Sequence, residues 1–199
     1  MSARVAALPA LRRGLAVAAV TAVVTADPAA ADRPDLRVDV EPAAYVLRGY
    51  SVHLRVATPW HPRLVAGVGA YGFDMPSLLI DLAPGNRDEA WDVRLSLGTN
   101  VFFDYFLGAH ADHGWLAGAQ LGVQHYRVRH GGDEQTVVTL LVLARVGYEW
   151  HPFAQGFYLF PWLGAAIGPV IGGQTMVGGD TYDVAPVVPY GAVELGWRF

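Results

Sequence analysis

The sequence predicts an all-β fold, an eight-stranded antiparallel up-and-down transmembrane β-barrel preceded by a cleavable signal peptide. Apolar and polar residues alternate with period two along eight stretches, each bounded by Gly, Pro, Asp or Asn. Within most of these stretches the charged residues share one face and the large apolar residues share the other. The chain is 53% hydrophobic, yet after residue 31 it has no run of about 18 apolar residues that would predict a spanning helix. An exported chain of this kind must bury its apolar surface in a core or expose it to lipid as a closed barrel.

The first 31 residues have the order of a secretory signal. Three arginines precede an apolar run over residues 14–25, and small residues follow at 28–31. The run is shorter than the roughly 20 residues that span a bilayer. We therefore expect residues 1–31 to be a removed signal peptide and residues 32–199 to be one barrel domain, with a disordered Ala-rich tail as the alternative reading of the leader.

Composition narrows the classes of partner. The chain has 199 residues, enough for one domain, and a net charge of −4. All fourteen basic residues are arginines and they form no basic run, so nucleic acid is not an expected partner. The absence of cysteine removes disulfides and a lipid-anchoring thiol from consideration.

The first three predicted strands cover residues 36–47, 50–58 and 63–73. The first is short in its regular part, because Val38 and Val40 alternate with charged residues only until Pro42 restricts the run. The second alternates clearly and places His53 and Arg55 on its polar face. The third is apolar on both faces, so the sequence leaves its orientation open. A helical turn within residues 75–82 is possible in the loop that follows.

The next three predicted strands cover residues 91–106, 114–130 and 136–150. In the first of them the odd positions are apolar and the even positions are polar, charged or small in most cases. We therefore expect odd residues such as Leu97 and Phe103 to face lipid and even residues such as Arg94 and Asp104 to face the interior. The other two strands repeat this separation, with the apolar set on odd positions of 114–130 and on even positions of 136–150.

The last two predicted strands cover residues 157–172 and 184–199. The seventh is apolar on both faces, and its orientation is open for the same reason as that of the third. The eighth ends at the terminal Phe199 after an alternating run that includes Glu194 on its polar face.

The polar faces together predict an interior ionic network. A narrow eight-stranded barrel has an interior that side chains just fill, and an unpaired buried charge costs several kcal/mol, about 3–5 where a partner is removed. Five positive and six negative residues are close to balance, so we expect them to pair inside a plugged barrel. The predicted network consists of Arg37, Asp39, Glu41, Arg55, Asp92, Arg94, Asp104, Arg145, Glu149, Glu194 and Arg198.

The apolar faces have the dimensions of a membrane-spanning band. The apolar run from Trp115 to Val123 covers about nine residues, which at ~3.3 Å per residue and ~40° tilt span roughly 23 Å. Aromatic rings near strand ends fit the two membrane interfaces, and we expect Trp91 and Tyr158 among them. The two longest connections, 74–90 and 173–183, fall on one side, which we expect to be the outer side, with both termini in the periplasm.

The last strand carries the motif on which a family resemblance depends. Alternating apolar residues end in a terminal aromatic, namely Val193, Leu195, Trp197 and Phe199. This pattern resembles the C-terminal insertion signal of bacterial outer-membrane barrels, and the resemblance implies recognition by the barrel-assembly machinery. With its eight predicted strands, the chain resembles the small outer-membrane barrels typified by the OmpA membrane domain and OmpX. The resemblance implies a location in the bacterial outer membrane. It does not extend to wall anchoring, because the chain shows no peptidoglycan-binding domain.

Reactive residues suggest one enzymatic alternative. Ser51 and His53 share a strand face and are candidates for a lipid-modifying acyl ester hydrolase. The simpler interpretation is a polar pair that fills the barrel, and the His-x-Ser-Asn arrangement of outer-membrane lipid A deacylases is not found. His110, Asp112 and His113 are acceptable metal ligands, but three polar groups in a short turn more often face solvent. We therefore assign no catalytic residue, no metal and no cofactor.

Two surface features suggest contacts outside the membrane. Arg127 and Arg129 continue the lipid-facing register beyond the apolar band, where lipopolysaccharide phosphates would lie. The loop over residues 74–90 holds the apolar residues 78–80, which we expect to cap the barrel, with lipid insertion or a partner as alternatives.

The expected function is therefore that of a monomeric outer-membrane barrel with a plugged interior, in contact with outer-membrane lipid and lipopolysaccharide. It would serve envelope integrity or surface interaction and would not be an enzyme. The alternatives are a lipid-modifying enzyme and a narrow pore or binder of small hydrophobic molecules. A soluble lipocalin-like barrel is the alternative fold, and it predicts the reverse arrangement of apolar and polar faces.

Overall fold

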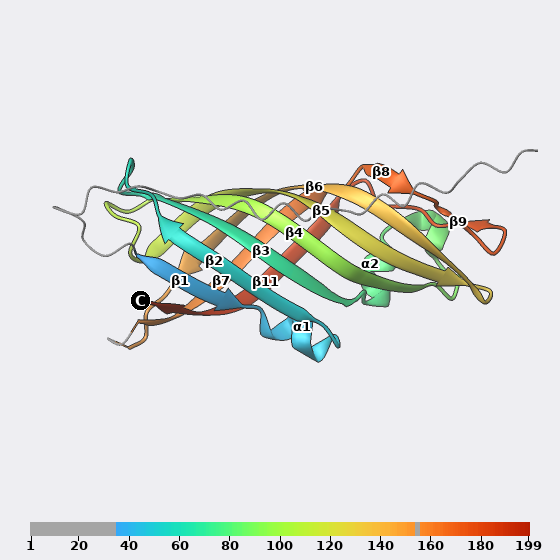
Figure 1. The fold of residues 1–199 in the computed structure, drawn as a ribbon, viewed down its shortest axis with the longest axis horizontal. Coiled ribbons are helices and arrows are strands. Elements are labelled where there is room, and N and C mark those ends of the chain that lie inside the picture. The colour runs from blue at the N-terminus through green and yellow to red at the C-terminus, as the bar shows by residue number, and fades with distance from the viewer. Residues whose placement is uncertain (1–34, 154–155) are drawn as a thin grey trace, which may run out of the picture. The chain divides into compact units, whose positions relative to one another are not determined.

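The described part of the chain forms a closed barrel of eight antiparallel strands. The structure, a computed structural model, describes residues 35–153 and 156–199, so the predicted signal peptide lies outside the described residues. The predicted eight-stranded antiparallel barrel is confirmed (Figure 1). Its strands are β1 (Leu36–Val40), β2 (Tyr50–Ala57), β3 (Leu64–Asp74), β4 (Asp92–Phe106), β5 (Gly114–His130), β6 (Asp133–Glu149), β7 (Phe157–Ile167) and β11 (Val188–Arg198).

Each barrel strand pairs with its neighbours in sequence, and the first and last strands close the ring. β1 pairs with β11 over four positions, from Arg37 opposite Arg198 to Val40 opposite Leu195. The longest ladder joins β5 to β6, which run from Gly114 opposite Glu149 to the turn after His130. We call the end at which β11 finishes the C-terminal end of the barrel. The opposite end, which carries the β5–β6 turn, is the hairpin end.

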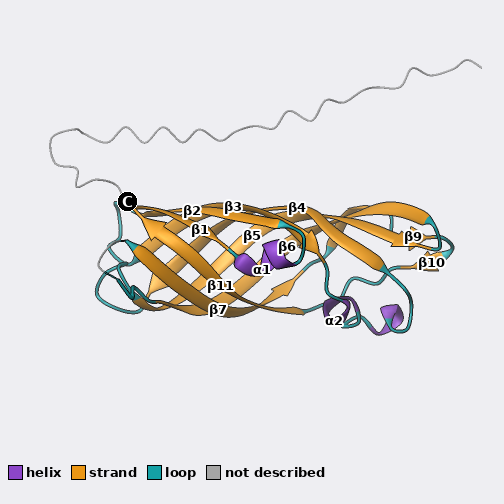
Figure 2. Cartoon of the chain, turned by 90° about the horizontal axis from the view of Figure 1, so that it is seen from below, coloured by secondary structure: helices purple, strands orange, loops and turns teal. Residues whose placement is uncertain are grey.

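Two predicted strands are shorter than expected because of proline. β1 ends at Val40, and Pro42 begins the helix α1 (Pro42–Val46), where proline is tolerated because the first helical N–H has no partner. β7 ends at Ile167 before Gly168 and Pro169, and a separate short strand β8 (Val170–Gly173) continues along β6. Helix α1 lies beside β11, where the missing part of β1 would otherwise run (Figure 2).

The remaining short elements lie at the hairpin end (Figures 1 and 2). They are α2 (Ser77–Ile80), the 3-10 turn η1 (Pro84–Asn86), β9 (Met176–Val177) and β10 (Asp180–Thr181). The helical turn that the sequence allowed within residues 75–82 is thus present as α2. Among the described residues, no helix is both long enough and apolar enough to cross a bilayer.

The barrel is apolar outside and charged inside. Leu121 on β5 and Val146 on β6 are 52% and 56% exposed, whereas Arg55 on β2 is fully buried. The two orientations that the sequence left open are now defined, because Val68 of β3 and Leu163 of β7 are 51% and 70% exposed on the outer surface. The alternate residues of these strands point inward, and in β3 they include Gly67 and Gly69. A Cβ at Gly69 would collide with the His53 ring. Glycine at this position therefore leaves space in the lumen for the His53 side chain of the neighbouring strand β2.

Candidate functional site in the barrel lumen

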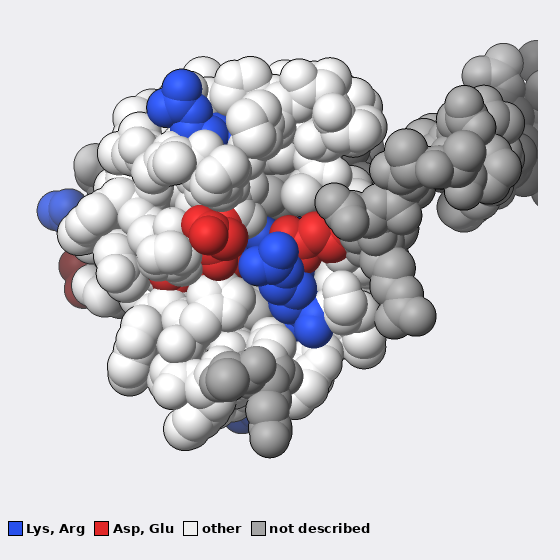
Figure 3. All heavy atoms as spheres, turned by 90° about the vertical axis from the view of Figure 1, so that its left-hand side faces the viewer, with Lys and Arg blue, Asp and Glu red and all other residues white. Residues whose placement is uncertain are grey.

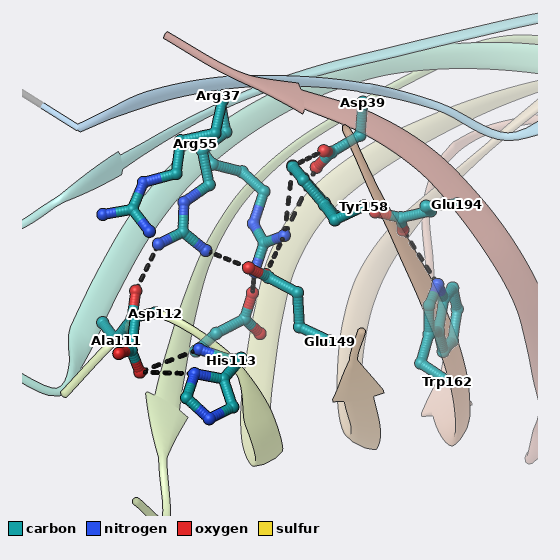
Figure 4. Close-up of polar contacts among 12 residues, drawn as sticks. Arg37, Asp39, Arg55, Ala111, Asp112, His113, Glu149, Tyr158, Trp162 and Glu194 are labelled. Atoms are coloured by element: carbon teal, nitrogen blue, oxygen red, sulfur yellow. Dashed lines mark hydrogen bonds and ion pairs between the residues drawn. The ribbon is translucent and has the colours of Figure 1, made fainter. Parts of the chain in front are cut away.

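An ionic cluster fills the lumen toward its C-terminal end (Figure 4). Glu149 of β6 accepts hydrogen bonds from two arginines of the opposite wall, at 2.5 Å from Arg37 Nη1 and 3.0 Å from Arg55 Nη1. The three side chains are fully buried. Strands β1 and β2 place the two guanidinium groups side by side, because Arg37 and Arg55 are direct partners in the β1–β2 ladder.

Asp104 of β4 connects this pair to a third arginine. Its carboxylate accepts from Arg55 Nη2 at 3.1 Å and from Arg145 Nε and Nη2 at 3.0 and 2.8 Å. The contact with Arg145 is therefore bidentate, the strongest form of arginine–carboxylate pairing. Arg145 also lies 3.4 Å from Glu194 Oε1 of β11, and the same oxygen accepts from Trp162 Nε1 at 2.8 Å.

Aromatic rings enclose the charges. The Arg55 and Arg145 guanidinium carbons lie 4.9 and 5.1 Å from the centroid of the Phe160 ring, and Arg145 also lies over Phe102. Tyr158 donates a hydrogen bond to Asp39, which is also 3.6 Å from Arg55. The arginine–ring contacts supply cation–π attraction in a buried site. The charged side chains of the cluster are all at most 3% exposed, so the cluster is buried inside the barrel.

The connection over residues 107–113 and two partly exposed side chains lie over the ionic cluster at the C-terminal end. Arg37 donates to the carbonyl oxygen of Ala111, which is buried. Arg198 lies 2.6 Å from Asp35, and His151 lies 2.9 Å from Glu149. Acidic and basic side chains accordingly meet in the middle of this face (Figure 3).

An apolar cap closes the hairpin end. Trp91 packs on the His130 ring at 4.3 Å between centroids and meets Tyr182 edge to face at 5.5 Å. Leu95 and Ile80 are buried in the same cluster. Burial raises the pKa of Tyr182 to about 12, so this phenol is neutral at physiological pH and adds no charge to the cap.

Seven of the eleven residues predicted for the interior network lie fully inside the barrel. They are Arg37, Asp39, Arg55, Asp104, Arg145, Glu149 and Glu194. Glu41 and Arg198 are partly exposed, Glu41 after the end of β1 and Arg198 at the C-terminal end. Of these nine, every one except Glu41 has an ion-pair partner among the described residues.

The prediction that Asp92 and Arg94 belong to the interior is wrong. A β-bulge between Leu95 and Leu97 shifts the β4 register against β5, so the parity of inward positions changes along the strand. Before the bulge Trp91 and Leu95 point inward and are buried, while Arg94 lies outside and binds Asp74. Trp91 is therefore part of the cap and is not an interface ring.

Tyr158 was likewise expected at a membrane interface, but it points inward and is fully buried. It occupies the even, lumen-facing register of β7 together with Phe160 and Trp162. Sequence reasoning missed these three rings as partners of the ionic cluster, because β7 is apolar on both faces. The three rings share the even positions of the strand with Gly164, whose Cα faces the backbone of Arg145. A glycine at one of these even positions is the sequence feature that could have indicated the crowded, inward face.

Ser51 and His53, the two candidate residues of the hydrolase alternative, are not hydrogen-bonded to each other. Ser51 and His53 both point into the lumen and are buried, as their shared parity predicts. Within the described chain, neither Ser51 Oγ nor His53 Nδ1 has a hydrogen-bond partner, so the two do not form a nucleophile–base pair. Asp112 and His113 contact each other at 3.1 Å in an exposed turn. No group of three or more His, Cys, Asp or Glu residues in the described ranges could hold a metal ion.

The predicted surface residues lie on the outside of the barrel. Arg127 and Arg129 lie near the hairpin end of β5, and both pair with Glu134, at 3.3 and 2.5 Å. Arg129 also lies 3.5 Å from Asp92. In the second half of β11 and at the terminal residue, Val193, Trp197 and Phe199 are exposed and Leu195 is partly exposed.

Comparisons with known proteins add no relative: no family model, curated protein or solved structure matches this chain.

Proposed function

We propose that this chain is a monomeric barrel of the bacterial outer membrane, with a plugged interior, that serves envelope integrity or surface interaction without catalysing a reaction. The observation that carries the proposal is the inversion of the usual arrangement, with buried ion pairs inside and exposed aliphatic and aromatic side chains outside. Full exposure of a Val, Leu or Phe side chain to water forgoes roughly 1.5–3 kcal/mol. A continuous apolar band around a barrel exceeds the apolar patches of soluble monomers, so lipid is the solvent that suits this surface.

The aromatic side chains support the same orientation. At the C-terminal end of the outer surface Trp115 packs edge to face on Tyr148 at 5.3 Å, and Trp150 and Trp197 are exposed. Rings of this kind gather at membrane interfaces. With short connections at the C-terminal end and α2, β9 and β10 at the other, the hairpin end is the proposed extracellular end.

The interior supports a role that does not depend on solute flow. The ionic cluster and the apolar cap occupy successive levels of the lumen, and their side chains are buried. Binding specificity would then reside on the hairpin-end loops, which the rigid barrel supports.

We expect the protein to partition with the outer-membrane fraction and to migrate differently on gels before and after boiling, because a folded barrel resists detergent unfolding. We also expect no ion conductance after reconstitution into planar bilayers. Recovery in the soluble fraction, with one gel mobility, would contradict the membrane location. Steady single-channel currents would contradict the plugged interior.

We further propose that Arg127 and Arg129 contact lipopolysaccharide phosphate. Both guanidinium groups point outward beyond the apolar band and are half exposed. The cost of an arginine on the lipid face falls to about 0–1 kcal/mol at the interface, where an anionic phosphate can pair with it. Glu134 and Asp92 hold the two side chains in place without burying them.

The double variant Arg127→Ala/Arg129→Ala should lose co-purifying lipopolysaccharide, measured as lipid per protein after detergent extraction. Arg87→Ala, which removes an exposed arginine from the loop over residues 74–90, is the matched control and should retain it. Equal retention by the double variant and the control would remove the lipopolysaccharide contact from the proposal.

A further inference from the structure

The lumen contains a cavity between the ionic cluster and the apolar cap. Its volume is about 50 Å³, and its walls include Glu41, His53, Asn100, Tyr190 and Glu194. A water molecule needs about 10–15 Å³ measured in this way, so the cavity has room for roughly three or four non-hydrogen atoms. It is therefore large enough for a small polar group and too small for a lipid chain.

Three buried polar atoms of these walls lack hydrogen-bond partners within the described residues. They are Glu194 Oε2, Asn100 Oδ1 and His53 Nδ1, on side chains that are 1%, 6% and 7% exposed as whole residues. The other polar atoms of the first two are engaged, because Glu194 Oε1 accepts from Trp162 and the Asn100 amide donates to Gln120 at 2.7 Å. A carboxylate oxygen and an amide oxygen can only accept, so two of the three unpartnered atoms require a donor.

Buried carboxyl groups outnumber the buried arginines of the lumen. The fully buried network contains three arginines, Arg37, Arg55 and Arg145, against the four carboxylates Asp39, Asp104, Glu149 and Glu194. Glu41 adds a partly buried carboxylate to the cavity wall and has no ion-pair partner in the part of the chain that is described. A buried carboxyl group without a basic partner is accommodated either by holding a proton or by binding a cation.

The cavity lies beside a break in the β1–β11 and β1–β2 pairing of the barrel wall. Because β1 stops at Val40, the stretch 188–194 of β11 and the stretch 50–52 of β2 each pair with only one neighbouring strand. Helix α1 lies at this break, and Tyr45 Oη donates to the free carbonyl of Ser51 at 3.0 Å. Tyr190 and the outward-facing Gly191 of β11 line the cavity, and so does Glu41, so the cavity reaches the unpaired edge.

We propose that the cavity binds a protonated primary amine, R–NH₃⁺, with Glu194, Glu41 and Asn100 as the acceptors. A primary ammonium has one positive charge and three N–H donors, which matches two carboxylates and an amide oxygen. The group reaches the cavity through the wall break beside α1, either as a free small amine or as the headgroup of a membrane lipid. No covalent step is involved.

The test uses the purified protein in dodecyl maltoside micelles and compares methylammonium chloride with tetramethylammonium chloride at equal ionic strength. Methylammonium should raise the thermal unfolding midpoint in a saturable manner, and tetramethylammonium, which has no N–H donor, should not. Glu41→Gln should weaken methylammonium binding by about tenfold, since it removes a charged acceptor. Glu134→Gln, on the outer surface, is the matched control and should leave the response unchanged.

Vesicles then distinguish the sources of the amine. If a lipid headgroup is the ligand, phosphatidylethanolamine vesicles should stabilise the protein more than phosphatidylcholine vesicles, and Glu41→Gln should abolish the difference. Equal stability in both vesicles, with the methylammonium response retained in micelles, identifies a free amine. Equal effects of the two chlorides in micelles, or an unchanged methylammonium response in Glu41→Gln, would overturn the proposal. The micelle measurement does not depend on the membrane location, so its failure would leave the proposed function standing.

Discussion

Replacing Arg55 with methionine should lower the free energy of unfolding by about 3–5 kcal/mol, the cost of breaking a buried ion pair by removing one partner. Arg55 is the centre of the cluster, because its guanidinium lies 3.1 Å from Asp104, 3.0 Å from Glu149 and 3.6 Å from Asp39. All four side chains are fully buried. The variant leaves three carboxylates with one fewer cation in a site that water does not reach.

The loss should come from the stranded carboxylates and not from packing, since methionine fills much of the space of the arginine stem and is flexible enough to adapt. A second variant separates the two causes. Asp39 has Arg55 as its ion-pair partner among the described residues, whereas Asp104 keeps Arg145 and Glu149 keeps Arg37. Adding Asp39→Asn to Arg55→Met removes the stranded charge, and we expect this double variant to recover part of the lost stability because coupled sites are not additive.

The measurement is urea unfolding of the folded barrel in lipid vesicles, followed by the mobility shift on gels. Arg94→Met is the matched control, because Arg94 pairs with Asp74 on the outside of the barrel and is about one-third exposed. Exposed ion pairs contribute about 0–1 kcal/mol, so the control should unfold nearly as the parent does. Similar losses in the Arg55 and Arg94 variants would show that burial of the network is not what stabilises the barrel.

The contrast between Arg55 and Arg94 also shows how far sequence alternation can predict this fold. Period-two alternation predicted all eight barrel strands and placed Arg55 correctly, because β2 is regular from end to end. It failed at Arg94, since a bulge inserts one residue into β4 and exchanges its two faces beyond that point. The odd positions from 91 to 97 are apolar both before and after the bulge, so the alternation in the sequence does not indicate that a bulge is present.

Strands β3 and β7 were undetermined for a different reason. Both of their faces are apolar or small, and the choice between them depends on which face fits the neighbouring strands. Gly67 points inward because the Phe102 ring of β4 occupies the space that a side chain would need. Trp162 points inward, where its indole N–H donates a hydrogen bond to Glu194. These contacts join residues that are far apart in the chain, so the alternation within a single strand cannot predict them.

Placing an arginine in the middle of the outer apolar band should cost about 2–4 kcal/mol if lipid surrounds the barrel, and close to nothing if water does. Ala119 is a suitable site because it lies at the centre of the outward run from Trp115 to Val123 and is exposed. Its ladder partners are Phe103 on β4 and Ala144 on β6. The variant Ala119→Arg therefore removes no packed side chain, so its cost would be the transfer of the charge into hydrocarbon.

Ala117→Arg provides the control on the same strand and face. Ala117 lies closer to the Trp115 and Tyr148 rings, where a long side chain can reach water, and its cost should be about 1 kcal/mol or less. The unfolding free energies of both variants would be measured in the same vesicles by urea titration. A clear difference between the two unfolding free energies supports a bilayer around the barrel, because the cost of an exposed arginine depends on its depth in lipid and would not depend on its position in water. Two variants that are both within about 0.5 kcal/mol of the parent, the usual range for exposed substitutions, would instead place the apolar band in water.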